Sequence, residues 1–210
     1  LHAQWEQLFI VISVLSMAVG NLGAIIQTNI KRMLAYSSIA HMGYMLLGFC
    51  SGTPEGYSAS LFYMFGYVVM TLGAFGLIVS LSRLGFEANY IDDLSGLNDR
   101  SPWLAFMMLL VMFSLAGIPP MIGFIAKLGV LEALISVHHT YLAVAAILFA
   151  VIGAFYYIRI VKVMYFESPK QVLPVLCAHD NYVIFSVNGL VVLFLGLFPG
   201  ALFSVCHYLF

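Results

Sequence analysis

Charged residues are scarce in this sequence. Asp, Glu, Lys and Arg make up 8% of its 210 residues, whereas a soluble domain carries about 25%. The hydrophobic share is 63%, which excludes an ordinary soluble domain and predicts an integral membrane protein. The net charge is −1 and the few basic residues form no cluster, so the composition does not favour a nucleic-acid partner.

Cysteines are also few, and they stand far apart. Cys50, Cys177 and Cys206 form no CxxC pair and no spacing typical of a metal site. The chain also lacks a GxGxxG loop after a strand, which is the fingerprint of a dinucleotide site. We therefore expect no cofactor and no metal in this chain.

Long apolar segments fill most of the chain, and a helix needs about 20 apolar residues to cross a bilayer. On that measure the sequence predicts an all-α bundle of about six membrane spans, at residues 8–27, 33–50, 57–81, 103–137, 141–164 and 182–210. The last span has a weak point at Pro199-Gly200. The polar connections at 83–102 and 167–181 are too short to form a domain, so residues 1–210 are expected to form a single bundle.

The basic residues indicate how this bundle is oriented. Seven of the eight fall at one end of the predicted spans, namely Lys31, Arg32, Arg83, Arg100, Arg159, Lys162 and Lys170. The positive-inside rule makes that end cytoplasmic, so both ends of the chain are expected to face outward. The eighth basic residue, Lys127, lies inside a predicted span.

Gly117 and Pro119-Pro120 interrupt the fourth predicted span. Proline lacks an N–H group and clashes with the preceding turn, so the helix breaks there. Backbone groups freed at membrane depth must be buried in protein or face water. Lys127 follows the break, and a lysine costs about 2.5–3.5 kcal/mol at the bilayer centre. We therefore expect Lys127 to carry an ion, a proton above all, through the membrane.

Other polar residues have a functional and a structural interpretation. His41 can relay protons near neutral pH or pack through hydrogen bonds. Glu132 is turned from Lys127 by about 140° on an ideal helix, and it is either an interfacial carboxylate or an exit-path proton acceptor. The residues assigned to a supporting proton path or to the helix break are Gly117, Pro119, Pro120, Glu132, His41 and Lys31. Tyr156-Tyr157 are expected to anchor a span at the interface, and His138-His139 to be solvated.

Two long motifs, in this order, carry a resemblance to a known family. The first is Gln27-Thr-Asn-Ile-Lys-Arg-Met-Leu-Ala-Tyr-Ser-Ser-Ile-Ala-His-Met-Gly-Tyr44, and the second is Ala116-Gly-Ile-Pro-Pro-Met-Ile-Gly-Phe-Ile-Ala-Lys127. Together with Gly153-Ala-Phe-Tyr-Tyr-Ile-Arg159, they resemble segments of the antiporter-like membrane subunits of respiratory complex I. The likeness extends over essentially the whole chain.

Within this family the closest resemblance is to the N-type subunits. The L- and M-type subunits and the Mrp sodium/proton antiporters tend to carry His and Lys on the span before the broken helix. This chain has Tyr63, Tyr67 and Thr71 there. The resemblance therefore implies one titratable station fewer, and no proton transfer is assigned to that span.

The resemblance implies a fold of two inverted five-helix repeats, each with a broken helix. This chain matches the second repeat over residues 1–164, and residues 165–210 add a cytoplasmic connection and a final helix. The sequence begins at Leu1 without a signal-peptide pattern. We therefore expect the C-terminal half of a longer subunit whose N-terminal half is missing.

The resemblance also implies partners and a function. NADH, FMN, iron–sulfur clusters and quinone would bind in partner subunits. The partners of this chain would be other membrane subunits of complex I, neighbouring antiporter-like subunits among them, and the lipid of a bacterial inner (plasma) membrane. The chain would then be a proton-translocating, non-redox subunit of NADH–quinone oxidoreductase, coupling quinone reduction in its partners to proton transfer through Lys127.

Water is expected to reach Lys127 through the gap at the break, in surroundings where burial disfavours a charged amine. Rearrangement of neighbouring charges would then change its protonation and its access to either side. Two alternatives stay open. The chain could be a subunit of a sodium/proton antiporter, or an inert structural half-subunit that bridges its neighbours.

Overall fold

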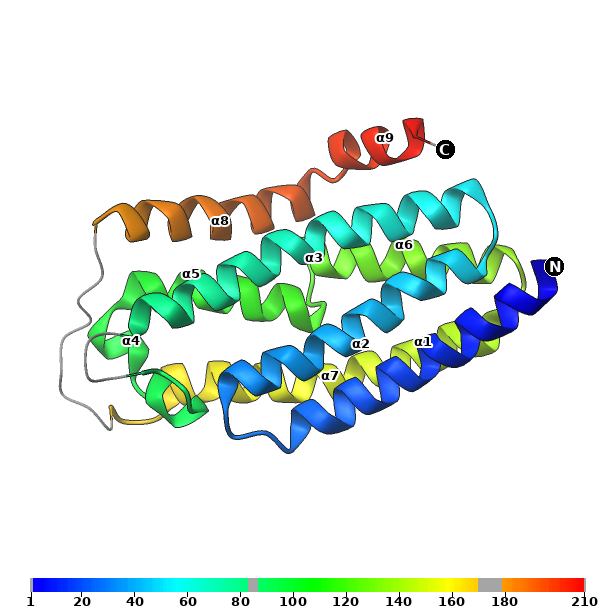
Figure 1. Cartoon of the computed structure of the whole chain (residues 1–210). Helices are drawn as coiled ribbons and strands as arrows, with labels where there is room; N and C mark the ends of the chain where they lie inside the picture. The colour runs from blue at the N-terminus through cyan, green and yellow to red at the C-terminus, as the bar shows by residue number, and fades with distance from the viewer. Residues whose placement is uncertain (1, 83–86, 170–178, 210) are drawn as a thin grey trace.

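A computed structural model of the chain describes residues 2–82, 87–169 and 179–209. Over these residues the fold is a helical bundle without strands (Figure 1), made of α1 (His2–Ile25), α2 (Ile30–Cys50), α3 (Pro54–Leu81), the 3₁₀ turn η1 (Ile91–Leu94), α4 (Leu97–Arg100), α5 (Pro102–Ala116), α6 (Ile122–Ser136), α7 (Thr140–Phe166), α8 (His179–Leu197) and α9 (Gly200–Tyr208). The predicted all-α fold is confirmed. Arg83, Lys170 and Cys177 lie outside the described residues.

Five of the described helices, α1, α2, α3, α7 and α8, are long and apolar enough to cross a membrane. Local sequence sets several of their ends. The Asn29 side chain accepts a hydrogen bond from the Arg32 N–H at the start of α2, and Thr53 caps α3 in the same way. Pro54 occupies the first position of α3, where a missing N–H costs nothing.

The fourth predicted span is broken in two, as expected. The helices α5 and α6 have 15 residues each, so neither reaches the length of about 20 residues that a crossing requires. They lie end to end along the bundle (Figure 1), joined by residues 117–121, which include a cis peptide bond between Pro119 and Pro120. The pair therefore makes one crossing from two half-helices.

The ends of the helices alternate along the bundle (Figure 1). The turn from α1 to α2, the connection from α3 to α5 and the end of α7 lie at one end. The start of α1, the turns after α2 and α6, and α9 lie at the other end. Consequently the described basic residues other than Lys127 gather toward one end, as the expected six crossings require; they are Lys31, Arg32, Arg100, Arg159 and Lys162.

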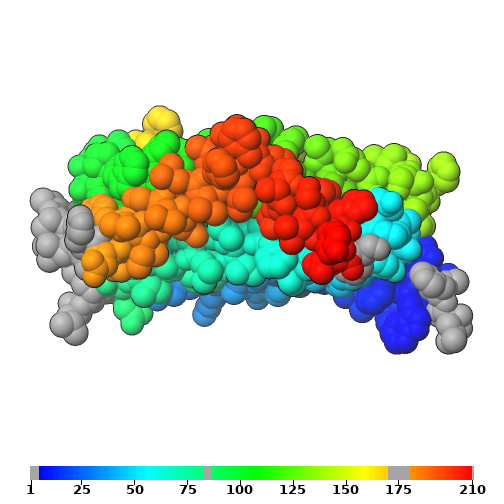
Figure 2. All heavy atoms as spheres, turned by 90° about the horizontal axis from the view of Figure 1, so that it is seen from above, coloured from blue at the N-terminus to red at the C-terminus, as the bar shows by residue number. Residues whose placement is uncertain are grey.

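The last two helices lie along the outside of the bundle. Figure 2 shows α8 (orange) and α9 (red) lying between α3 (teal) on one side and α5 and α6 (green) on the other. The predicted weak point at Pro199-Gly200 is where α8 gives way to α9. The final segment therefore runs past both halves of the broken helix.

Candidate functional site

Lys127 lies in α6, and its ammonium group turns back to the end of α5. Its Nζ donates hydrogen bonds to the carbonyl oxygens of Leu115, at 3.1 Å, and Ala116, at 2.9 Å. The final carbonyls of a helix have no partner within the helix, and a cation is favoured beside them by the helix dipole. Lys127 therefore caps the first half-helix from the second.

The two prolines explain why these particular carbonyls are available. In an uninterrupted helix the carbonyl of residue i accepts from the N–H of residue i+4. The donors for Leu115 and Ala116 would thus be residues 119 and 120, and both are prolines without an N–H. The Lys127 ammonium supplies the two hydrogen bonds that Pro119 and Pro120 cannot.

Gly117 makes this arrangement possible. Its φ of +84° is in the left-handed region, where a residue with a Cβ is disfavoured, and its N–H bonds the carbonyls of Phe113 and Ser114, each at 3.0 Å. A Cβ at this position would lie 2.9 Å from Nζ of Lys127. Glycine therefore both ends α5 and leaves room for the lysine.

Ser114 ties the two half-helices together on another side. Its Oγ accepts a hydrogen bond from the Gly123 N–H at 3.1 Å and donates to Sδ of Met70 at 2.8 Å. Gly123 is needed at that contact, because a Cβ there would collide with the Ser114 carbonyl. Ser114 thus joins α5, α6 and α3 beside the break.

Two cavities lined by described residues adjoin Lys127. A lateral cavity of about 260 Å³ is lined by Lys127, Tyr44 and Gly117 and mainly by apolar side chains of α6 and α7. The ammonium lies 5.4 Å from the centroid of the Tyr44 ring, within the range of a cation–π contact. A smaller void of about 10 Å³ touches both Lys127 and His41, and that is about the space one water needs.

His41 is buried and hydrogen-bonded at both ring nitrogens. Its Nδ1 lies 2.8 Å from the hydroxyl of Tyr63, and its Nε2 lies 3.1 Å from that of Tyr157. The Tyr67 ring stacks on the imidazole with centroids 4.9 Å apart. A neutral imidazole has one N–H, so one tyrosine donates while the other accepts. Such a group can take up a proton at one nitrogen and release it from the other.

The interfacial role expected for Tyr156-Tyr157 is wrong. The two side chains are 2% and 1% exposed, and Tyr156 donates its O–H to Oδ1 of Asn21 at 3.1 Å. The pair lies well before the end of α7 at Phe166 and stays inside the bundle. Polar partners from α1 and α2 hold them there.

The structure does not bring every predicted residue to Lys127. Glu132 lies on the exposed side of α6 and lines neither cavity beside the lysine. Lys31 lies at the start of α2, 3.7 Å from the Glu87 carboxylate, and the helical rise places it about 15 Å from His41 along the axis. Within the described ranges, no carboxylate comes within ion-pair distance of Lys127.

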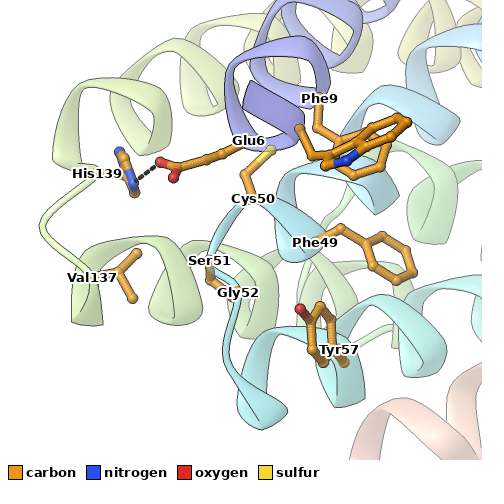
Figure 3. Close-up of a pocket in the computed structure, with 10 residues that line it drawn as sticks. Glu6, Phe9, Phe49, Cys50, Ser51, Gly52, Tyr57, Val137 and His139 are labelled. Carbon is orange, nitrogen blue, oxygen red and sulfur yellow. Dashed lines mark ion pairs between the residues drawn. The ribbon is translucent and has the colours of Figure 1, made fainter. Parts of the chain in front are cut away.

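A third cavity, of about 480 Å³, lies at the end of the bundle where α1 begins. Glu6 of α1 and His139 point toward each other there (Figure 3), with Nε2 of His139 3.0 Å from the carboxylate. The expectation that His139 is merely solvated is therefore wrong. Across residues 2–82, 87–169 and 179–209, no group of three or more His, Cys, Asp or Glu residues could hold a metal ion.

Comparison with known proteins places these features in context. A family model described as "NADH:quinone oxidoreductase/Mrp antiporter, TM" matches residues 1–153. The NADH-quinone oxidoreductase subunit N of Coxiella burnetii is 61% identical over 100% of this chain and 44% of its own length. The chain thus spans less than half the length of such a relative.

Solved structures give the same fold. A chain of respiratory complex I from Thermus thermophilus with bound NADH matches with a TM-score of 0.86 and 28% identity, over 99% of this chain and 44% of that chain. A chain of the Mrp complex from Dietzia sp. DQ12-45-1b matches with a TM-score of 0.84 and 20% identity, over 97% of this chain and 46% of its own. The second likeness concerns the fold alone.

Proposed function

The chain belongs to the NADH:quinone oxidoreductase/Mrp antiporter family of transmembrane proteins, and from that premise we propose that it is part of a proton-translocating membrane subunit of an NADH–quinone oxidoreductase. One observation carries the proposal. Lys127 provides the two hydrogen bonds that Pro119 and Pro120 deny to the α5 carbonyls, and it shares a water-sized void with His41.

The proposed mechanism depends on the charge of Lys127. When protonated, the ammonium is attracted to the carbonyl end of α5 and holds the break closed. When the amine is neutral, this attraction is lost and the end of α5 is held more weakly. Gain and loss of a proton at Nζ therefore change how the two half-helices are joined.

A water in the small void would connect Lys127 to the polar cluster formed by His41 of α2, Tyr63 of α3 and Tyr157 of α7. The proton leaves Nζ for that water and passes to the hydroxyl of Tyr157, which also lines the void and gives its own O–H proton to Nε2 of His41. Nδ1 of His41 then gives its proton to the Tyr63 hydroxyl, which at the same time passes its own O–H proton to the next acceptor on the path, so the imidazole returns to its neutral form. These steps transfer protons only and involve no electron transfer within this chain.

The remaining parts of the proposal follow from family membership. NADH, FMN, iron–sulfur clusters and quinone would bind in other subunits, and quinone reduction there would drive the change at Lys127. The partners would be further membrane subunits, in a bacterial inner membrane. Both ends of this chain would face outward, so cysteines at Asn89 and Thr53 should label from opposite sides, Asn89 from the cytoplasm; labelling from the same side would contradict this orientation.

The test uses the assembled complex in sealed membrane vesicles. Lys127→Met keeps much of the apolar stem but removes the amine, so proton uptake per NADH oxidised should fall by the share that passes through this site. Lys162→Met is the matched control, because Lys162 lies on the exposed surface near the end of α7, and it should pump like the parent. Subunit content is checked by blotting in both cases.

Normal proton uptake in an assembled Lys127→Met complex would contradict the proposal and favour an inert structural subunit. Uptake that depends on an opposite sodium gradient, rather than on NADH oxidation, would favour a sodium/proton antiporter. The first outcome concerns the lysine and the second the driving force, so the two can be told apart.

A further inference from the structure

Gly196 of α8 lies directly on the backbone of the break. A Cβ at this glycine would collide with the carbonyl oxygen of Pro120 and would lie 2.6 Å from the amide nitrogen of Ile122. Pro120 belongs to the linker between the half-helices, and Ile122 is the first residue of α6. The α8 backbone therefore approaches the break more closely than any side chain would allow.

This contact ends a line of contacts that α8 makes along α5. Near the start of α5, the Tyr182 hydroxyl lies at hydrogen-bond distance, 3.1 Å, from the Ser101 hydroxyl. The Ser186 hydroxyl accepts a hydrogen bond from the Trp103 indole N–H at 2.7 Å. Further along, a Cβ at Gly189 would lie 2.6 Å from Sδ of Met107. These α8 positions recur at spacings of three, four and seven residues, which places them on one helix face.

The chain beyond Gly196 also engages the second half-helix. In α9, the Phe203 ring lies against Gly129 of α6, 3.3 Å from where a Cβ of that glycine would be, and its centroid is 4.8 Å from that of Phe62 in α3. The segment α8–α9 thus contacts α5, the break and α6 in turn, and Figure 2 shows it lying beside the green α5 and α6. It spans the interruption on the outside.

We infer that Gly196 is a positioning residue that fixes the geometry of the break, and with it the α5 carbonyls that hold Lys127. The inference rests on the proposed function, because it concerns how well that site couples proton transfer to NADH oxidation in the complex. Close backbone contact transmits a displacement of α8 directly to residues 120–122, since the packed interior has little free volume to absorb it.

The experiment compares three glycine-to-alanine variants in the assembled complex. Gly196→Ala should assemble, yet proton uptake per NADH oxidised should fall several-fold, and its dependence on pH should shift because the surroundings of Lys127 change. In Gly189→Ala the new Cβ comes too close only to Sδ of the flexible Met107 side chain and otherwise makes ordinary contacts, and Gly200→Ala meets nothing within 4 Å. Both controls should keep the parent's coupling and pH profile.

Phe203→Ala provides a second test that adds no bulk near the break. It releases α9 from α6 and should produce a smaller shift of the pH profile in the same direction, even where Gly196→Ala assembles poorly. Parent-like coupling and pH profiles in both Gly196→Ala and Phe203→Ala would overturn the inference. A Lys127→Met complex measured in parallel separates the claims, because normal uptake there contradicts the proposed function instead.

Discussion

The broken pair α5–α6 and the next helix, α7, cross the bundle in opposite directions and satisfy their backbones differently. The 27 residues of α7 form one continuous helix, and its basic residues, Arg159 and Lys162, lie in its last turns. The pair α5–α6 places its one basic residue, Lys127, in the middle of the bundle, against the carbonyls of its own partner half-helix.

This difference shows that the break and the lysine depend on each other. Without the prolines, Lys127 would have no free carbonyls to bond, and a lysine at that depth would be costly. Without Lys127, two carbonyls would be left without donors, which is also costly away from water. The four residues that carry the arrangement are Gly117, Pro119, Pro120 and Lys127.

The largest effect is expected from making α5–α6 resemble α7. The double variant Pro119→Ala with Pro120→Ala restores the two N–H donors for Leu115 and Ala116, and each interior proline disfavours a helix by about 3 kcal/mol relative to alanine. The carbonyls would then bond within a continuous helix and release Lys127. The complex should assemble, and proton uptake per NADH should fall severely.

Each single variant refines this test, because Pro119→Ala provides a donor for Leu115 alone and Pro120→Ala for Ala116 alone. Both single variants should lose less proton uptake per NADH oxidised than the double variant. Full uptake in a properly assembled double variant would mean that the break is only a packing accommodation.

A smaller effect is expected at Gly117, where the chain leaves α5. Gly117→Ala puts a Cβ into a left-handed conformation, at a cost of roughly 1–2 kcal/mol, and brings it against the Lys127 ammonium. Thermal unfolding of the purified complex should begin at lower temperature, and proton uptake should decline. Gly200→Ala is the control, and equal behaviour of the two variants would show that Gly117 has no special role.

The smallest effect is expected in the tyrosine cluster. Tyr157→Phe removes the hydroxyl at Nε2 of His41 but keeps the ring, and a polar contact between membrane helices averages about 0.6 kcal/mol. Stability should hardly change, while proton uptake slows because His41 loses one of its two partners. Tyr165→Phe at the end of the same helix should leave the rate unchanged, and an unaltered rate in Tyr157→Phe as well would exclude that hydroxyl from the path.

The sequence predicted most of the fold, for physical reasons that act locally. The length of the apolar segments locates the spans, and Asn29 and Thr53 cap two of the helices. Proline forces the break whatever the helix packs against. Local terms also single out Lys127, because it is the one basic residue in the middle of a predicted span, whereas Arg159 and Lys162 lie near the end of theirs.

The partners within the site could not be predicted in this way. The acceptors of Lys127 are main-chain carbonyls of Leu115 and Ala116, which no side-chain pattern marks, although the four-residue offset to the prolines was a usable signal. The pair Tyr156-Tyr157 was misplaced because its burial depends on partners from α1 and α2, Asn21 and His41, which are distant in sequence. His139 was misjudged because its partner Glu6 lies on a helix distant in sequence.

The most direct test of the central claim is proton uptake by the Lys127→Arg complex. Arginine keeps the positive charge and the N–H donors that cap α5, yet its guanidinium does not lose its proton in proteins. If Lys127 carries the proton, this complex should assemble with the parent's subunit content and still oxidise NADH. It should take up no protons through this site. Proton uptake at the parent rate would contradict the account and reduce Lys127 to a structural cap.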